Sequence, residues 1–197
     1  MNAPYATGAD LLVLHGLRCI GFASLDRVAE AAGLSADDAE SELLDLAASG
    51  LVTHLRGDFG GWGLTEAGRA ADAERIAAEL DEAGARAAVA AAFEEFLVLN
   101  PELLDLCAAW QLRSADPAYE ARVLDRFADF DQRAGIVCAA LAAQLLRFGR
   151  YRTRLTDALS RARSGALGYL TDEVGSYHTV WFQLHEDLLA TLGIPRG

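Results

Sequence analysis

The stretch over residues 24–65 constrains the fold of this chain more than any other. It reads SLDRVAEAAGLSADDAESELLDLAASGLVTHLRGDFGGWGLT. Ser24 can cap a helix with apolar residues at helical spacing, and Gly33 follows where a left-handed residue ends such a helix. Ser35 can cap a second helix over 36–48. The pattern predicts two consecutive helices joined by a tight turn.

A short hairpin is predicted directly after the second helix. Residues 51–56 suit a strand, because their side chains would alternate between two faces. The glycine-rich segment 57–61 is the predicted tip, and Trp62 and Leu64 belong to a return strand. Thr65 can cap the helix that follows. The predicted order is therefore helix, turn, helix and two-stranded hairpin.

In this order and spacing, residues 9–85 resemble the MarR-type family of bacterial transcription regulators, which share a winged helix-turn-helix fold. The resemblance implies that the second helix enters the DNA major groove and that the hairpin, called the wing, touches the DNA backbone. It carries these roles to the outward positions of 36–48 and to 56–62. It also implies a homodimer that binds double-stranded DNA. The candidate DNA-binding residues are Arg27, Ser41, Arg56, Phe59 and Gly60.

The charge of the predicted recognition helix conflicts with this role. The helix over 36–48 contains no Arg or Lys, and the wing offers only Arg56, which Asp58 offsets. DNA affinity comes largely from cations that neutralise phosphates, and each like-charge contact at a wet surface costs about 1 kcal/mol. Two hypotheses therefore stay open, one with DNA binding and one without it. The outward acidic residues are Asp37, Asp38, Glu40, Glu42 and Asp45.

The composition of the chain restricts where the protein can be located and which partners it can bind. The net charge is −12 and no lysine is present, which discourages nonspecific contact with DNA or anionic membranes. The start of the chain, MNAPYATGAD, lacks the features of a signal peptide, and no apolar segment reaches transmembrane length. Cys19, Cys107 and Cys138 lack Cys-x-x-Cys spacing, which indicates buried, reduced cysteines. We expect a cytoplasmic protein without a membrane segment.

Outside the central stretch, the sequence predicts a helical chain with short loops. Residues 1–8 are expected to form a loose arm. The segment over 66–93 keeps a helical apolar rhythm, with a bend predicted at Gly84. Asn100 and Pro101 combine a helix cap with a proline suited to the first turn, which predicts a new helix there. Further helices are expected over 10–19, 117–148, 150–164 and 171–192.

These elements define three parts of a mostly α protein. We expect a winged helix-turn-helix with a two-stranded β-wing over 1–65, a long connecting helix over 66–99 and a multi-helix C-terminal domain over 100–197. The C-terminal part is longer than the single-helix dimerisation arm that is usual in the family. It resembles the accessory helical domain of some actinobacterial MarR-like proteins. The resemblance implies ligand binding or dimerisation in that part.

The final helix contains an unusual set of aromatic and histidine residues, SYHTVWFQLHEDLLATLG. His178, Trp181 and His185 are spaced i, i+3 and i+7, so they share one face. A metal site is disfavoured, because the pattern H-E-x-x-H is absent. The histidines either fill polar gaps between helices or face a small-molecule pocket with aromatic walls. The candidate pocket residues are Trp110, Gln111, Tyr119, Tyr177, His178, Trp181 and His185.

A second unusual stretch, RFGRYRTRLTDALSRAR over 147–163, contains six arginines and one acid. Because Arg side chains match phosphate and carboxylate groups, one interpretation is a phosphate, carboxylate or nucleotide site. Arg147 and Arg150 therefore join the candidate ligand-binding residues. A second interpretation is a nucleic-acid surface. The alternative is that these arginines pair with the acids of the protein itself.

Taken together, the sequence favours a regulator, and nothing in it requires an enzymatic reaction. It has no G-x-S-x-G, P-loop or G-x-G-x-x-G pattern, and we expect no cofactor and no metal. The first hypothesis is a DNA-binding transcriptional regulator of MarR-like type whose helical domain senses a small-molecule effector. The alternative is a winged-helix protein that has lost DNA binding and acts as a ligand-binding, protein-interaction or biosynthetic enzyme module. The location of the stretch 147–163 in the fold discriminates between these hypotheses. Only this stretch has enough basic charge to compensate for the acidic recognition helix, and it can do so only if it lies near that helix.

Overall fold

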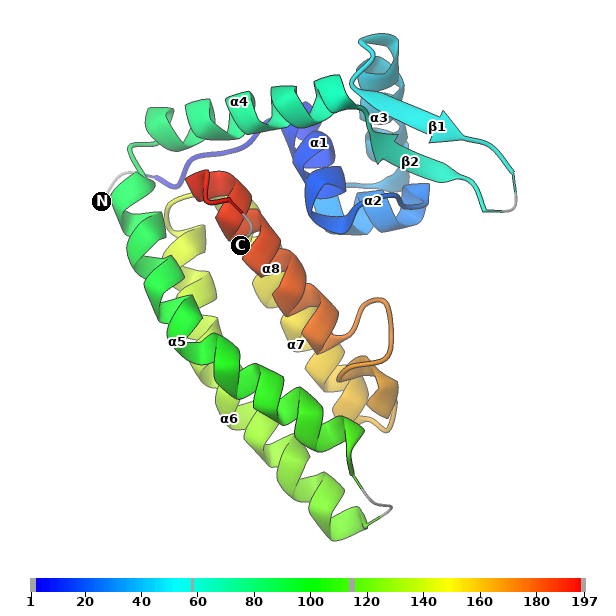
Figure 1. The fold of residues 1–197 in the computed structure, drawn as a ribbon. Helices are drawn as coiled ribbons and strands as arrows, with labels where there is room; N and C mark the ends of the chain where they lie inside the picture. The colour runs from blue at the N-terminus through cyan, green and yellow to red at the C-terminus, as the bar shows by residue number, and fades with distance from the viewer. Residues whose placement is uncertain (1–2, 58, 114–115, 196–197) are drawn as a thin grey trace.

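The computed structural model describes residues 3–57, 59–113 and 116–195. This part of the chain is mostly helical, with a two-stranded antiparallel sheet between helices, so the mostly α fold class is confirmed (Figure 1). Within the described ranges, no helix is both long and apolar enough to cross a membrane. The elements are α1 (Ala9–Ile20), α2 (Leu25–Ala32), α3 (Ala36–Ala48), β1 (Val52–Leu55), β2 (Gly61–Leu64), α4 (Glu66–Glu82), α5 (Arg86–Gln111), α6 (Pro117–Ala142), the 3-10 helix η1 (Leu146–Phe148), α7 (Gly149–Arg163), the 3-10 helix η2 (Leu167–Tyr169) and α8 (Tyr177–Leu192).

Two hydrophobic cores organise these elements. The first core lies among α1, α2, α3 and the hairpin, and it contains Leu14, Val28 and Leu43. The second core lies among α5, α6, α7 and α8, and it contains Phe96 and Trp181. In Figure 1, α4 runs from the hairpin past α1 to the start of α5, and α5 and α6 form a long antiparallel pair. Helix α8 contacts α1 and α4 as well as α5 and α7, so it joins the two cores.

The predicted hairpin is present. Strand β1 pairs with β2 in antiparallel register, with His54 opposite Trp62. The rings of these two residues stack with 4.2 Å between their centroids. Ala23 forms an isolated antiparallel bridge to Trp62, which holds the chain before α2 against the hairpin. The first strand is shorter than the predicted 51–56, and Asp58 at the tip lies outside the described residues.

The N-terminal segment is not the loose arm that we expected over 1–8. The Tyr5 amide donates to the Gln144 carbonyl at 2.8 Å, and the Leu146 amide donates to the Tyr5 carbonyl at 2.9 Å. Tyr5 thereby forms a short parallel bridge with the chain between α6 and η1. The expectation is wrong for this part of the segment because backbone hydrogen bonds fix it, whereas residues 1 and 2 lie outside the described chain.

The predicted connecting helix over 66–99 is two helices in the structure. Helix α4 begins after Thr65, whose hydroxyl accepts a hydrogen bond from the Gly68 amide at 3.0 Å. It ends at Glu82, and Gly84 then adopts a φ of 60°. This left-handed conformation suits glycine and terminates a helix. The bend predicted at Gly84 is therefore a complete change of helix, and α5 begins two residues later.

The new helix predicted at Asn100 is wrong, because α5 continues through this point with Pro101 inside it. The proline removes one backbone hydrogen bond and normally disfavours a helix interior. Leu99 and Leu103, on either side, are both buried in the second core, and this packing stabilises the continuous helix. The Asn100 side chain does not act as a cap. Its Oδ1 accepts a hydrogen bond from Trp181 Nε1 at 3.0 Å.

The helix predicted over 117–148 also differs, because α6 ends at Ala142 and η1 follows after a turn. Leu145 adopts an extended backbone conformation there, since it forms the bridge to Tyr5. A partner that is distant in the sequence thus determines where this helix ends. The predicted start of this helix is confirmed, and Asp116 caps it, since its side chain accepts a hydrogen bond from the Ala118 amide at 3.0 Å.

The last helix begins later than the predicted 171–192. Its cap is Ser176, which accepts a hydrogen bond from the Thr179 amide at 3.3 Å. The preceding segment is a turn in which the Asp172 and Glu173 amides both donate to the Gly168 carbonyl. These bonds close a compact turn after η2, so the chain cannot be helical from residue 171.

The three cysteines are free and buried, as the sequence predicts. Burial raises the pKa of Cys107 to about 12, and burial is also the main reason that the pKa of Cys138 is raised to about 12. Thiolates are the reactive form of cysteine, so these two side chains behave as small apolar groups of the core.

Candidate functional site

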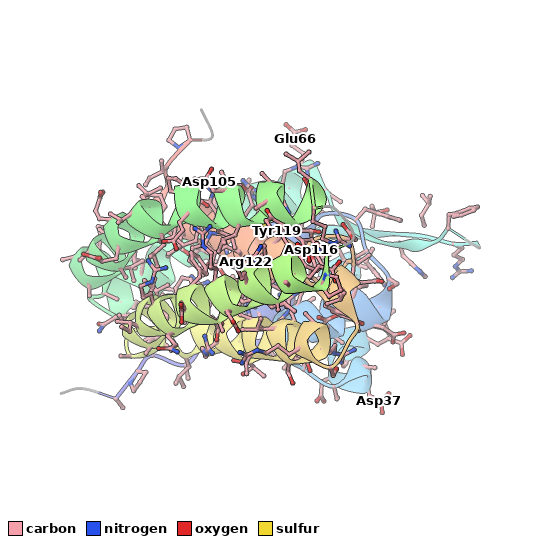
Figure 2. The ribbon with its side chains drawn as sticks, turned by 90° about the horizontal axis from the view of Figure 1, so that it is seen from below. Asp37, Glu66, Asp105, Asp116, Tyr119 and Arg122 are labelled. Atoms are coloured by element: carbon pink, nitrogen blue, oxygen red, sulfur yellow. The ribbon has the colours of Figure 1, made fainter. Side chains whose placement is uncertain are left out.

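Helix α3 presents an acidic face to solvent. The predicted cap is present, because the Ser35 hydroxyl accepts a hydrogen bond from the Asp38 amide at 3.1 Å. Figure 2 shows Asp37 at the outer edge of the molecule. Burial raises the pKa of Glu42, and the nearby carboxylates of Asp10, Asp45 and Asp38 add to this. The exposed positions of α3 are Ala36, Asp37, Asp38, Glu40, Ser41, Leu44, Asp45 and Ala48.

A hollow of about 400 Å³ lies between α3 and the hairpin. Its lining includes Arg56 and Gly60 of the hairpin, Ser24 at the start of α2 and Glu40 of α3. The structure thus brings two of the candidate DNA-binding residues, Arg56 and Gly60, to one surface. The same surface contains a carboxylate from α3, which opposes the binding of an anion beside Arg56.

The other three candidate DNA-binding residues lie at separate places. Phe59, near the hairpin tip, is 95% exposed. Ser41 is exposed on α3. Arg27 is different, because it lines a cleft between α2 and α7 and its Nη1 lies 3.9 Å from Glu30. The structure therefore separates Arg27 from the hollow that Arg56 lines.

The arginine-rich helix α7 directs most of its cationic side chains toward the acids of the protein itself. Arg152 forms a bidentate pair with Asp131, with N–O distances of 2.9 and 2.6 Å. Arg161 Nε lies 2.7 Å from Asp157. These side chains are engaged, so they do not form an open basic surface beside α3. The arginines of this stretch with an ion pair to an acid of the chain are Arg147, Arg150, Arg152, Arg154 and Arg161.

Arg147 and Arg150 belong to a buried ionic cluster centred on Asp187. Arg147 Nη1 donates to Asp187 Oδ1 at 2.5 Å, and Arg150 Nη2 donates to Oδ2 at 3.0 Å. The Tyr151 hydroxyl also donates to Oδ2, at 2.9 Å. Burial alone would raise the pKa of Asp187, yet the charges of Arg147 and His15 lower it well below its usual value.

The cluster extends from Asp187 to two acids of α4. Arg147 Nε donates to Glu79 Oε2 at 2.8 Å. His15 of α1 lies between two carboxylates, with Nδ1 2.9 Å from Asp72 Oδ1 and Nε2 3.0 Å from Asp187 Oδ1. All of these side chains are almost completely buried. The ionic cluster therefore ties α1 and α4 to η1, α7 and α8.

The charges of the cluster sum to zero when His15 is protonated. Three carboxylates, from Asp72, Glu79 and Asp187, then face two guanidinium groups and one imidazolium. Burial lowers the pKa of His15, but Cys19 and Asp187 raise it more strongly, so it lies well above its usual value. The protonated ring donates from both nitrogens, which satisfies both neighbouring carboxylates. Overall neutrality is a condition under which buried charges are tolerated. The hydrogen bonding is incomplete, because Nε and Nη1 of Arg150 are buried without a partner among the described residues.

Sequence reasoning missed most of this cluster. It singled out Arg147 and Arg150, as ligand-binding candidates, but not His15, Asp72 or Asp187. The available signal was a polar residue where helical spacing requires an apolar one, as at His15 within LLVLHGLRCI. Several helices of the chain contain such residues, so spacing alone could not pair them.

His15, Cys19 and Asp187 place one potential metal ligand atom each within 4.8 Å of the others. However, both Asp187 oxygens already accept hydrogen bonds from guanidinium groups, those of Arg147 and Arg150. A divalent cation would therefore sit beside two fixed positive charges in a buried region, where repulsion is strong. These residues do not fit a metal ion, and we assign the ionic cluster a structural role.

Three of the aromatic and histidine candidates lie together on α8 in the second core. The rings of Trp181 and Phe96 stack with 4.4 Å between centroids, and the His185 ring lies 5.1 Å from that of Phe96. The Tyr177 hydroxyl donates to Asp131 Oδ1 at 2.9 Å. These contacts are those of a packed interior, in which aromatic rings fill space between helices.

The remaining candidates for the same pocket do not share its aromatic core contacts. Trp110 and Gln111 lie at the end of α5, where the Tyr119 hydroxyl donates to the Ala109 carbonyl at 3.3 Å. Trp110 is fully buried, with the Arg113 guanidinium 3.9 Å from the centre of its ring. Gln111 is exposed at the end of α5, and Tyr119, labelled in Figure 2, is half-buried near the start of α6. His178 is half-buried on the first turn of α8. The structure thus distributes these residues between the core and the connection from α5 to α6.

No protein-family model matches this chain, and no significant match exists among curated proteins or solved structures. The resemblance to MarR-type regulators therefore stays a prediction from the sequence.

Proposed function

We propose that this protein is a winged helix-turn-helix regulator of the MarR type, which binds double-stranded DNA as a homodimer. The observation that supports this is the order α1–α2–α3–β1–β2, with α3 and the hairpin exposed on either side of one hollow. In Figure 1 the hairpin extends well beyond the helices. This shape suits a duplex, because a helix fits the major groove and a projecting hairpin can reach the backbone.

Arg56 is the cation best placed for a phosphate contact in this proposal. It is exposed on the hairpin and lines the hollow together with Ser24, at the N-terminus of α2. Free backbone N–H groups at a helix N-terminus favour phosphate, and the Ser24 side chain makes no capping hydrogen bond to them. The carboxylate of Glu40, near the centre of α3, repels a phosphate group. The DNA backbone would therefore contact Arg56 and the start of α2.

The helical half supplies the regulatory part of the proposal. Helix α8 packs against both α1 and α4, and Asp187 links it to His15 of α1. A small molecule that binds one arrangement of α5–α8 more tightly than another would shift α1 and the winged helix with it. In a homodimer, such a shift changes the distance between the two DNA-contacting surfaces.

The charge of α3 favours a second candidate function. Its exposed face is acidic, and most arginines of the stretch 147–163 are paired with acids of the protein itself. In this alternative, the winged helix contacts a basic surface of a partner protein instead of DNA, and the chain acts as an interaction or ligand-binding module. The absence of Arg and Lys from α3 is the specific observation that favours it.

The experiment that separates the two candidates is selection of fragmented genomic DNA on the purified protein at several salt concentrations. The regulator predicts enrichment of a sequence with approximate two-fold symmetry, and an affinity that falls as salt rises. If no fragment is enriched at the lowest salt concentration, the DNA-binding proposal fails and the interaction module takes its place.

A further inference from the structure

The cleft between α2 and α7, which Arg27 lines, lies where the two halves of the molecule meet. It has a volume of about 490 Å³ and is formed by α2, α7 and the turn that precedes α8. Cavities of this size accommodate small organic molecules. The charged and aromatic side chains of its lining are Arg27, Glu30, Arg154, Asp157, Arg161, Tyr169 and Glu173.

Arg154 is a buried cation with an incomplete set of partners in this cleft. Its side chain is 10% exposed, and its Nε has no hydrogen-bond partner among the described residues. Glu30 Oε1 lies 3.4 Å from that nitrogen without forming a hydrogen bond. Burial lowers the pKa of Arg154, and Glu30 offsets this only in part. A buried guanidinium in this condition favours an additional anion.

The negative charge near Arg154 comes from a carboxylate that is shared between two arginines and partly exposed. Glu30 is the carboxylate near Arg27 as well as near Arg154, so one acid serves two guanidinium groups. Its side chain is 47% exposed, so it can rotate into solvent at little cost. The other two acids differ, because Asp157 is paired with Arg161 and Glu173 lies against Gly168.

We infer that this cleft binds a small organic oxyanion, with a phosphate or carboxylate group held between Arg27 and Arg154. The anion takes the place that Glu30 occupies beside the two guanidinium groups. Guanidinium forks match both oxyanions through paired, charge-assisted hydrogen bonds. The remainder of the molecule lies along the ring of Tyr169, whose hydroxyl accepts a hydrogen bond from Arg161 at 3.0 Å.

This inference names the class of effector for the sensing function, and its regulatory consequence rests on the proposed function. Arg27 belongs to α2, which leads through the turn at Gly33 directly into α3. Arg154 belongs to α7, whose Arg150 is bonded to Asp187 in the ionic cluster. An anion bound by both arginines joins α2 to α7 and therefore fixes α3 relative to the helical half.

The test is isothermal titration calorimetry of the full chain, without DNA, with inorganic phosphate, pyrophosphate and succinate as probes at constant ionic strength. At least one probe is expected to bind the native protein. Arg154→Met and Arg27→Met should each weaken that binding about tenfold or more, because each removes a charge-assisted hydrogen bond. Glu30→Gln should strengthen it about fivefold, because it removes the competing carboxylate.

Arg133→Met is the matched control, because Arg133 is paired with Glu102 on the exposed surface of α5 and α6. It should bind the probes as the native chain does. Circular dichroism identifies a variant that does not fold, and Arg27→Met, at a quarter-exposed position, serves if Arg154→Met fails. The inference is overturned if none of the probes binds at about 10 mM. It is equally overturned if the folded arginine variants bind as well as the native chain, or if Glu30→Gln does not strengthen binding. Because DNA is absent, these results are independent of the DNA selection.

Discussion

Helices α3 and α7 contain the two strongest concentrations of like charge in this chain and use them in opposite ways. The acids of α3 lie mostly on its exposed face. Four arginines of α7, which are Arg150, Arg152, Arg154 and Arg161, are paired with acids of the chain itself. Arg150 lies in the buried ionic cluster together with Arg147 of η1. The charges in a stretch of sequence therefore do not predict the charge of the protein surface at that stretch. The surface charge depends on whether the fold places an oppositely charged side chain against each of these residues.

The two kinds of charge also contribute differently to stability. An exposed ion pair is screened by water and contributes about 0 to 1 kcal/mol. A buried charge whose partner is removed costs about 3 to 5 kcal/mol. The ionic cluster should therefore be sensitive to single substitutions, while the surface charges should mainly affect binding.

Removal of the charge of Asp187 should have the largest effect. Asp187→Asn leaves Arg147, Arg150 and His15 facing too little negative charge in a buried region, so the free energy of unfolding should fall by about 3 to 5 kcal/mol. Urea denaturation followed by circular dichroism measures this. The control is Asp157→Asn, at a position where 57% of the side chain is exposed, which should cost about 1 kcal/mol or less. Equal losses in the two variants would show that the cluster does not stabilise the fold.

The pH dependence of stability should report on His15. Its pKa is raised in the folded state, so the folded protein holds this proton more tightly than the unfolded chain does. The resulting stability is fully present below the unfolded pKa of about 6.5 and is lost as pH rises through the raised value. The loss is about 1.4 kcal/mol for each unit by which the pKa is raised.

Urea denaturation between about pH 6 and pH 9 measures this slope. His15→Gln should abolish it, whereas His54→Gln, at an exposed position on the hairpin, should retain it. A slope that survives in His15→Gln would assign the pH dependence to another group. On the acid side, the depressed pKa of Asp187 predicts a further loss of stability as pH falls below about 4.

A smaller effect is expected for DNA binding at the hairpin. Arg56→Ala should weaken binding of a selected site by about 1 kcal/mol in each subunit, because it removes one exposed phosphate contact. Anisotropy of a labelled duplex measures the change. Arg163→Ala removes another exposed arginine, at the end of α7, and should leave binding unchanged. If the two variants behave alike, Arg56 is not a DNA contact.

The smallest effect is expected from the acidic face itself. Glu40→Gln removes the carboxylate that lines the hollow with Arg56, so DNA affinity should rise by about 1 kcal/mol or less. The same duplex assay measures the gain. Lower affinity in Glu40→Gln would mean that this carboxylate accepts a hydrogen bond from a base, and that α3 reads DNA despite its charge.

Local signals in the sequence predicted the elements around residues 24–65 well. The cap at Ser35 and the glycine-rich hairpin act over a few residues, and the structure contains both. The predictions failed where distant parts of the chain decide. Packing of Leu99 and Leu103 carries α5 through Pro101, and the bridge from Tyr5 to Leu145 ends α6 early.

The candidate sites were harder to predict for the same reason. Aromatic residues at helical spacing, such as Trp181, are found in the second core, where their packing partners come from α5. The ionic cluster joins residues as far apart in sequence as His15 and Asp187. No local pattern links such residues, because they meet only once five elements of the chain are packed together.

The central claim is that most arginines of α7 are paired with acids of the protein itself, so that few cations would be free to contact DNA. The most direct test is the slope of log affinity against log salt for the selected duplex. Each phosphate neutralised contributes about −0.9 to this slope, so one Arg56 from each subunit of a homodimer predicts a slope of about −2. A slope of about −5 or steeper would mean that the α7 arginines reach DNA, and would contradict the claim. Absence of binding at every salt concentration would contradict the proposed function itself.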